Sequence, residues 1–316
     1  MRKSHYFQRR LHAANRGFSL IELLVSMVIG LLLAVAGSAA YLYSKQAYNS
    51  VSETSEMEQN GRFALTLLTR YVQSAGFVML NPQSLAPQGA QSVKLNGCIF
   101  GLVNGQAPTG SSDLNCRTAT PTGERVSESI LIVFDTDTPN NTGPLFQGFD
   151  CVGNRADAVV STSETGSTFN SYPIRSHFFI TQTTATTASG PVSMGQLSCL
   201  ADGTPPGGAF KSQNEPLIPG IEQLAVNYLL PFSPTVAGEF PRLAQAALTA
   251  DAVTAAARWN EVMAVELCVL TKSIQPAGND TGTQYTDCYG TAISAKPSES
   301  FRTFRSTVSL RNRTPV

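Results

Sequence analysis

The chain has 316 residues, with 22 basic and 22 acidic side chains and a formal net charge of zero. A neutral chain has no long-range field to attract nucleic acid, which argues against a DNA- or RNA-binding protein. Apolar residues make up 42% of the chain, so a core can form and disorder throughout is excluded. The three histidines are too few for a histidine-rich metal site.

The basic charge is concentrated at the N-terminus. Residues 1–17 carry five basic side chains and no acid, which leaves 17 basic against 22 acidic side chains in the rest of the chain. Residues 18–44 follow with one charged side chain, Glu22. A helix of this length extends about 40 Å, enough to cross a bilayer core of about 30 Å. We expect 18–44 to be a transmembrane helix, with residues 1–17 in the cytoplasm because they are basic.

An ordinary secretory signal fits this pattern poorly. Its apolar region would be about 7–15 residues long and would be followed by a small-residue cleavage site. Here the apolar run is longer, and the candidate cleavage site between Gly17 and Phe18 precedes it. An uncleaved signal anchor is the simpler alternative, and Glu22 argues against it.

Glu22 is an acid near the start of the apolar run. A carboxylate in the hydrocarbon region costs about 2.5–3.5 kcal/mol on insertion scales, so it is normally paired or functional. One interpretation is an unpaired acid at the membrane interface. The other is that cleavage after Gly17 exposes the α-amino group of Phe18, with which Glu22 of a neighbouring copy pairs. Such pairing in a low dielectric would set a fixed stagger between helices and so build a filament.

The basic leader, Arg16-Gly17 and the run from Phe18 to Val25 resemble the class III signal of type IV pilins and pseudopilins. The resemblance implies that a prepilin peptidase cleaves after Gly17 and methylates the new terminus at Phe18. It also implies that Glu22 directs subunit assembly. One difference is that this span lacks the helix-kinking proline of many major pilins.

The helical pattern continues beyond the span. In residues 45–76, apolar side chains recur at helical spacing on one broad face, and no proline occurs before Pro82. We therefore expect one helix from Phe18 to about Ala75. Its second half is amphipathic, which predicts that it packs against the globular part of the chain.

Residues 77–316 are rich in turn-forming residues and contain short strand-like runs, from which we expect a β-rich globular head. The predicted strands are Ser129–Phe134, His177–Thr181, Gln223–Leu230, Val262–Leu270 and Phe301–Leu310. Ala244–Trp259 is predicted to be a short helix capped by Asp251, and residues 161–190 to form exposed hairpin loops. The fold class expected is α+β and pilin-like, with an antiparallel sheet against the long helix.

Short segments at both ends of the chain resemble PilW-type minor pilins. They are Arg62–Leu68 with Ala75–Phe77, then Trp259–Leu267, and finally Thr307–Asn312. Their order along the chain adds to the resemblance. It implies a minor pilin of a type IV pilus that helps to prime assembly of the filament and enters it through its N-terminal helix.

The six cysteines all lie beyond the apolar span, which suits an oxidising compartment and three disulfides. Six cysteines allow fifteen connectivities. Sequential pairing closes the shortest loops, so we expect the pairs Cys98–Cys116, Cys151–Cys199 and Cys268–Cys288. A zinc site is the alternative, but the sequence has no Cys-x-x-Cys.

Other motifs give little support for an enzyme or a cofactor-binding protein. Asp135-Thr-Asp137 with Pro139-Asn140-Asn141 resembles a calcium loop, but Pro139 stands at a ligand position, which favours a turn at the end of a strand. His177 is predicted to be a strand residue and not a catalytic base. No phosphate-binding loop, dinucleotide fingerprint or nucleophile elbow occurs. We expect no catalytic residue, no metal and no cofactor.

Two alternatives to a minor pilin remain open, namely a J-type minor pseudopilin of a type II secretion system and a pilus-associated adhesive module. The expected location is the bacterial inner membrane, with the head in the periplasm, and then the pilus fibre at the cell surface. The expected partners are other minor pilins, the major pilin, the prepilin peptidase, the inner-membrane assembly machinery and the membrane itself, without nucleic acid.

Overall fold

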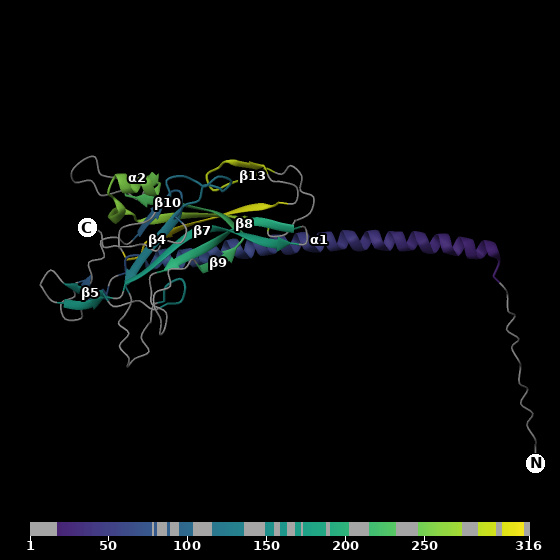
Figure 1. The fold of residues 1–316 in the computed structure, drawn as a ribbon, viewed down its shortest axis with the longest axis horizontal. Coiled ribbons are helices and arrows are strands. Elements are labelled where there is room, and N and C mark those ends of the chain that lie inside the picture. Colours follow the sequence, from purple (N-terminus) through teal and green to yellow (C-terminus); the bar gives the residue numbers. More distant parts are fainter. Residues whose placement is uncertain are drawn as a thin grey trace, which may run out of the picture. The chain divides into compact units, whose positions relative to one another are not determined.

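The computed structural model consists of two compact units, residues 1–49 (the N-terminal unit) and 50–316 (the head unit), each described here by itself (Figure 1). The structure describes residues 18–77, 79–80, 87–88, 95–103, 116–135, 149–154, 159–162, 168–171, 173–187, 190–201, 215–231, 246–273, 284–294 and 299–312.

The first element, α1, is a single helix over Leu20–Ser74, close to the helix expected from Phe18 to about Ala75. In the N-terminal unit it contains residues 20–49, whose apolar side chains point in all directions and are exposed. A helix that is apolar all round is stable only when a membrane or other apolar surface covers it. The composition of this half therefore demands surroundings that a single chain does not supply.

In the head unit the second half of α1 is one-sided. Its buried residues follow helical spacing along one stripe and are Glu53, Met57, Gly61, Ala64, Leu68 and Val72. Burial of such a stripe removes apolar area from water and supplies most of the stability of an amphipathic helix. Residues 50–74 thus belong to the core of the head, as the periodicity predicts.

The head contains two larger antiparallel sheets. The five-stranded sheet, of order β3-β4-β7-β8-β9, is formed by β3 (Leu95–Cys98), β4 (Ser129–Asp135), β7 (Pro173–Thr187), β8 (Gly190–Ala201) and β9 (Glu215–Pro219). The four-stranded sheet, of order β11-β10-β12-β15, is formed by β11 (Ala246–Leu248), β10 (Ile221–Leu230), β12 (Ala264–Lys272) and β15 (Phe301–Ser309).

Three short two-stranded sheets complete the strands of the described residues. They pair β1 (Met79–Leu80) with β2 (Pro87–Gln88), β5 (Val159–Thr162) with β6 (Thr168–Ser171), and β13 (Gln284–Thr286) with β14 (Ala292–Ser294). The α+β fold with antiparallel sheets beside a long helix, expected from the sequence, is confirmed.

Helix and sheets approach closely at two positions. A Cβ added to Gly61 of α1 would lie 2.4 Å from ring atoms of Phe304 in β15, so only glycine lets the ring contact the helix backbone. Nearly three helical turns further along α1, the Tyr71 ring meets the Phe178 ring of β7 edge-on, with 5.0 Å between centroids. The helix therefore packs on strands from both sheets, and Leu68 and Val72 lie in the shared core.

Two sequence predictions about secondary structure are wrong. The helix predicted for Ala244–Trp259 is replaced by β11, by a short helix α2 (Ala250–Ala255) and by a 3-10 turn at Trp259–Glu261. Thr249, not Asp251, occupies the N-cap position. The alanine-rich segment forms a strand because Ala246–Leu248 pairs with β10, and that tertiary contact outweighs helix propensity.

The second wrong prediction concerns residues 161–190. Much of this segment is β7, which pairs with β8 from Ser176 to Thr187, and its first half is largely buried. The threonines that suggested exposed loops are β-branched residues, which suit a strand.

Three disulfides join Cys98 to Cys116, Cys151 to Cys199 and Cys268 to Cys288. These are the sequential pairs expected from the sequence, and they leave no free cysteine. The third bridge links β12 to the loop between β13 and β14. Each bridge limits the unfolded chain and so contributes about 3–4 kcal/mol to stability.

Candidate assembly site

The described part of the N-terminal unit begins with Phe18 and Ser19, and α1 follows. The carbonyl of Ser19 accepts hydrogen bonds from the backbone N–H groups of Glu22 (3.0 Å) and Leu23 (3.1 Å). These bonds form the first turn and place the Glu22 carboxylate within that turn, close in sequence to Phe18. An acid in the first turn also complements the positive end of the helix dipole.

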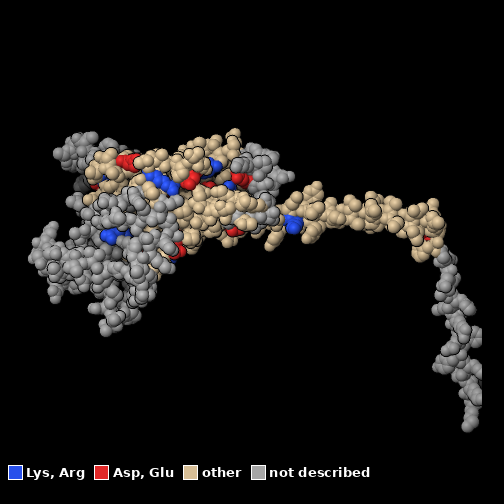
Figure 2. Space-filling model, viewed as in Figure 1, with Lys and Arg blue, Asp and Glu red and all other residues tan. Residues whose placement is uncertain are grey.

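The surface around Glu22 is apolar and uncovered. Phe18 is 80% exposed and Leu20 is 79% exposed. Among the described residues, α1 is the one helix long and apolar enough to cross a membrane, with a mean hydropathy of 2.5 over its most apolar window. Figure 2 shows this half of the helix almost without charge. An apolar surface of this extent calls for lipid or for other apolar helices.

The sequence predicts three residues that act together at this end, and the structure describes two of them. Phe18 lies two residues before α1, and Glu22 lies in its first turn, four residues after Phe18. Gly17 and the rest of the 1–17 leader lie outside the described residues. From Phe18 to Val51, Glu22 is the only acid and Lys45 the only base. Within this stretch of one chain, the nearest cation in sequence is more than six helical turns away from Glu22.

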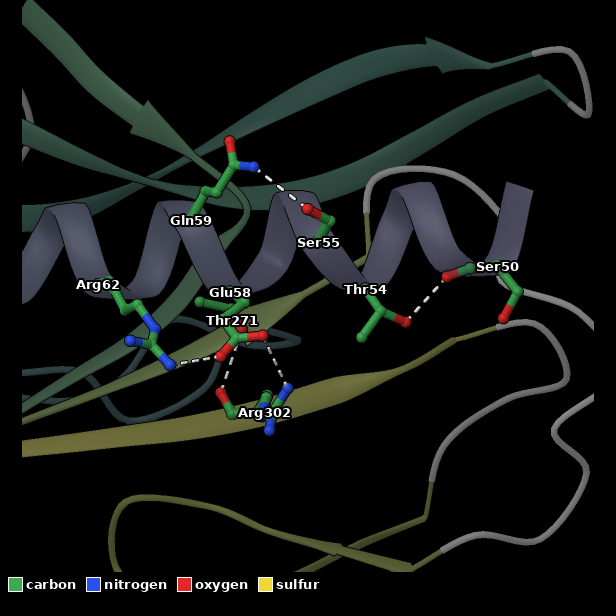
Figure 3. A network of polar contacts seen from close by, with 8 residues as sticks. All are labelled: Ser50, Thr54, Ser55, Glu58, Gln59, Arg62, Thr271 and Arg302. Atoms are coloured by element: carbon green, nitrogen blue, oxygen red, sulfur yellow. Dashed lines mark hydrogen bonds and ion pairs between the residues drawn. The ribbon is translucent and has the colours of Figure 1, made fainter. Parts of the chain in front are cut away.

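The second half of α1 is held against the head by a polar network (Figure 3). Arg62 donates a hydrogen bond to Glu58 Oε1 at 2.6 Å, and Arg302 Nη1 of β15 lies 3.5 Å from Glu58 Oε2. The hydrogen bond from Arg62, with the positive charges of Arg62 and Arg302, lowers the pKa of Glu58. Thr271 of β12 donates to the carbonyl of Arg302 at 3.1 Å. Because the charged side chains of this network are partly exposed to water, their ion pairs orient the helix more than they stabilise it.

The segment Thr307–Asn312 caps the C-terminal end of α1. The Asn312 side-chain amide donates to the carbonyls of Gln73 (3.3 Å) and Ser74 (3.4 Å). Both carbonyls belong to the last turn, where helix carbonyls lack partners within the helix. The segment Thr307–Asn312, noted in the sequence for its resemblance alone, therefore ties the end of the chain to the helix.

A buried carboxyl in the head was missed by sequence reasoning. Glu128 is 2% exposed and accepts hydrogen bonds from the Tyr289 hydroxyl (2.9 Å) and from the Val226 N–H (2.9 Å). Burial raises the pKa of Glu128 to about 7, against the lowering effect of these two hydrogen bonds. No local motif marks Glu128, because its partners lie about a hundred or more residues further along the chain.

His177 is a strand residue, as predicted. It lies fully buried in β7, with Nε2 3.1 Å from the Ser129 hydroxyl. Burial lowers the pKa of His177 to about 3, so the ring is neutral at physiological pH. Among the described residues, no group of three or more His, Cys, Asp or Glu side chains is placed to hold a metal ion. The calcium-like segment beyond Asp135 lies outside the described residues.

Comparison with known proteins gives two family matches. Residues 177–312 match the family described as Type IV Pilus-assembly protein W, and residues 12–38 match the prokaryotic N-terminal methylation motif. Among solved structures, a type IV-like pilin from Thermus thermophilus is similar, at 13% identity and a TM-score of 0.37, covering 81% of this chain and 96% of that one. No curated protein matches the chain.

These matches say what the chain is similar to, first at its N-terminus, where residues 12–38 match the methylation motif of type IV pilin-like proteins. More narrowly, the resemblance to PilW-type minor pilins stated from the sequence is confirmed. The methylation motif includes Gly17, Phe18 and Glu22, and the match to the W family includes β10, β12, β15 and Asn312. The apolar helix and the methylation motif fit a membrane-anchored pilin.

Proposed function

We propose that the chain is a minor pilin that is made as a precursor, inserted in the bacterial inner membrane and incorporated into a type IV pilus. Residues 1–17 are the cytoplasmic leader, 18–44 the membrane span, 45–76 its amphipathic continuation and 77–316 the periplasmic head. The prepilin peptidase cleaves between Gly17 and Phe18 and methylates the amine of Phe18.

One observation carries this proposal. The exposed apolar half of α1 contains a single acid, Glu22, in the first turn after the expected cleavage site. Cleavage creates a cation at Phe18, and the N-terminal amine of a neighbouring subunit then neutralises Glu22. An unpaired Glu22 in the hydrocarbon region would cost about 2.5–3.5 kcal/mol. This cost favours the axial offset between subunits at which Glu22 meets the amine of its neighbour.

The partners follow from this geometry. Other minor pilins and the major pilin offer matching apolar helices, so the N-terminal unit joins them in a bundle. The prepilin peptidase and the inner-membrane assembly machinery act on the same end of the chain. A complex of minor pilins formed in this way primes polymerisation of the fibre.

The replacement Glu22→Ala tests the pairing. We expect processing to remain normal, because the cleavage site is intact, and co-purification with other pilins from detergent-solubilised membranes to fall about tenfold or more. Glu56→Ala is the matched control, because it removes an exposed acid from the same helix within the head unit. Unchanged co-purification of the Glu22→Ala protein would contradict a role for Glu22 in pairing with a neighbouring subunit.

The replacement Gly17→Ala tests the leader. We expect the full precursor to accumulate, and mass spectrometry of the N-terminus to find Met1 in place of a methylated Phe18. Normal processing of this variant would contradict the cleavage assignment.

Deleting the gene tests which machine the subunit serves. Loss of surface pili and of twitching motility with normal protein secretion is expected. Lost secretion with normal piliation would instead assign the chain to a type II secretion system as a J-type pseudopilin.

A further inference from the structure

The head contains an open cleft of about 650 Å³ that the assembly proposal does not use. Residues from both large sheets line it, among them Gln182 of β7, Ser193 of β8, Glu222 of β10 and Lys272 of β12. Arg125, from the loop before β4, forms another part of the wall. The volume lies within the range of about 300–1,000 Å³ that is usual for small-molecule sites.

Most charged groups of the cleft already have partners. Lys272 pairs with Glu299 at 3.1 Å and donates to the carbonyl of Ser193 at 3.3 Å. Glu222, 8% exposed, accepts a hydrogen bond of 2.8 Å from the backbone N–H of Gly195. Glu124, also in the wall, pairs with Arg117 at 3.3 Å. Lys272, Glu299 and Glu124 are therefore neutralised by ion pairs, and Glu222 is held in place by the backbone.

Arg125 is different. Its guanidinium lies over the ring of Phe301, with 5.1 Å from Cζ to the ring centroid. Phe301 is buried and packs edge-on against Tyr285, with 5.7 Å between centroids, so the ring is a fixed platform. Within the described residues, the structure records no carboxylate paired with Arg125. A half-buried guanidinium without a counter-ion retains planar N–H donors suited to a carboxylate.

We propose that this cleft binds an acidic saccharide, whose carboxylate pairs with Arg125. Other lining residues suit the hydroxyl groups of a sugar, since Ser193 and Ser294 carry hydroxyls, Gln182 carries an amide and Glu222 offers carboxylate oxygens. A sugar ring both donates and accepts hydrogen bonds, so it can use this mixture, whereas a simple anion uses only the cation.

The site lies within the head unit and includes no residue of α1. Its function as a binding site is therefore independent of cleavage, methylation and pairing at Glu22. A minor pilin that carries it would present a receptor for acidic glycans on the fibre. Failure of the assembly experiments leaves this inference standing, and failure of the binding experiment leaves the assembly proposal standing.

The test uses the full mature chain in detergent micelles and measures binding by titration calorimetry. The probes are glucuronate, glucose, which has the same ring without the carboxylate, and acetate, which has the carboxylate without the ring. We expect glucuronate to bind about tenfold or more tightly than either of the others. Arg125→Gln should weaken glucuronate binding by about tenfold or more, the loss expected for one charge-assisted hydrogen bond.

Two further variants keep the test decisive. Arg311→Gln removes an exposed arginine remote from the cleft and should leave glucuronate affinity unchanged. Ser294→Trp narrows the cleft without altering charge and should also abolish binding. Absence of glucuronate binding to the unmodified chain, equal binding of acetate or glucose, or full affinity in Arg125→Gln would each overturn the proposal.

Discussion

The two halves of α1 share one backbone conformation and differ in what their side chains require. Residues 20–49 are apolar on every side and exposed, and each glycine there, Gly30 or Gly37, has open space around it. Residues 50–74 are apolar along one stripe and bury it in the head. The first half therefore depends on apolar surfaces outside the chain, whereas the second half is a structural part of the head.

Glu22 in the first half of α1 and Glu58 in the second half also differ in whether their partner lies in the same chain. Beyond the 1–17 leader, the basic residue nearest to Glu22 in sequence is Lys45, so the expected partner of Glu22 is another subunit. Glu58 is paired within the chain, by Arg62 on the helix and Arg302 on β15. The proposed role of the first acid is therefore association with another subunit, whereas the second links the helix to β15 of its own head.

Removal of an apolar side chain should give the largest difference in the stability of the head between replacements in the two halves of α1. Leu68 is fully buried in the core shared by helix and sheets, so Leu68→Ala should lower the free energy of unfolding of the head by about 2–5 kcal/mol. Leu33→Ala deletes the same group where the helix is exposed and should leave head stability unchanged. Denaturant unfolding of the full chain in detergent, followed by the fluorescence of its single tryptophan, Trp259, measures both.

Trp259 is a suitable reporter because its ring packs edge-on against buried Tyr228, with 4.8 Å between centroids. Equal losses of stability from Leu68→Ala and Leu33→Ala would show that the two halves of the helix unfold together and do not have separate environments.

Glu128 in the head is buried, in contrast to exposed Glu22. Its burial makes the free energy of unfolding of the head depend on pH. The pKa of Glu128 is raised from 4.5 to about 7 in the folded state, so folding favours its protonated form. This contribution is fully present below pH 4.5 and is lost as the pH rises through 7. The change amounts to about 3 kcal/mol, since each pKa unit corresponds to about 1.4 kcal/mol.

Glu128→Gln tests this pH dependence, because glutamine does not titrate and can still accept the hydrogen bond from Tyr289. The neighbouring groups that act on Glu128 are Tyr289, Val226 N–H and Asp251, while burial and then the charge of Glu128 raise the pKa of Tyr228. Chemical unfolding at a series of pH values should give a flatter curve between pH 4.5 and 7 for the variant. An identical slope in both proteins would assign the pH dependence to other groups.

Much of the architecture could be predicted from local patterns. The absence of proline and the change from uniform to one-sided apolar spacing are sufficient to predict one helix with two environments. The five predicted strands lie within or close to β4, β7, β10, β12 and β15. The sequential disulfide pairs follow from short loops, which close at the smallest entropic cost.

The features that sequence reasoning missed depend on partners distant in the chain. Asn312 meets Ser74 across 238 residues, and Glu128 meets Tyr289 across 161. The alanine-rich helix prediction failed because pairing of Ala246–Leu248 with β10 is decided by the sheet and not by local propensity. The cleft at Arg125 combines several strands and loops, and no linear motif describes it.

Replacing one glycine in each half of α1 tests whether the helix backbone is in contact with other elements there. Gly61→Ala would place a methyl group against the Phe304 ring, so we expect the free energy of unfolding of the head to fall by about 1–3 kcal/mol. Gly37→Ala meets no neighbouring atom and should favour the helix by up to about 1 kcal/mol without changing head unfolding. The same fluorescence titration compares the two. A stabilised head in Gly61→Ala would mean that the ring moves aside and that helix propensity prevails.

The end of α1 provides the smallest expected effect. Asn312→Ala removes the donor to the carbonyls of Gln73 and Ser74, leaving the last turn to be solvated by water. We expect a loss of about 0.5–1.5 kcal/mol in head stability and faster amide exchange in the last turn of the helix, with no change near Glu22. Arg311→Ala, an exposed neighbour, is the control. If exchange rose equally along both halves of α1 in Asn312→Ala, the cap would be acting on the whole helix, and the division between its halves would lose its basis.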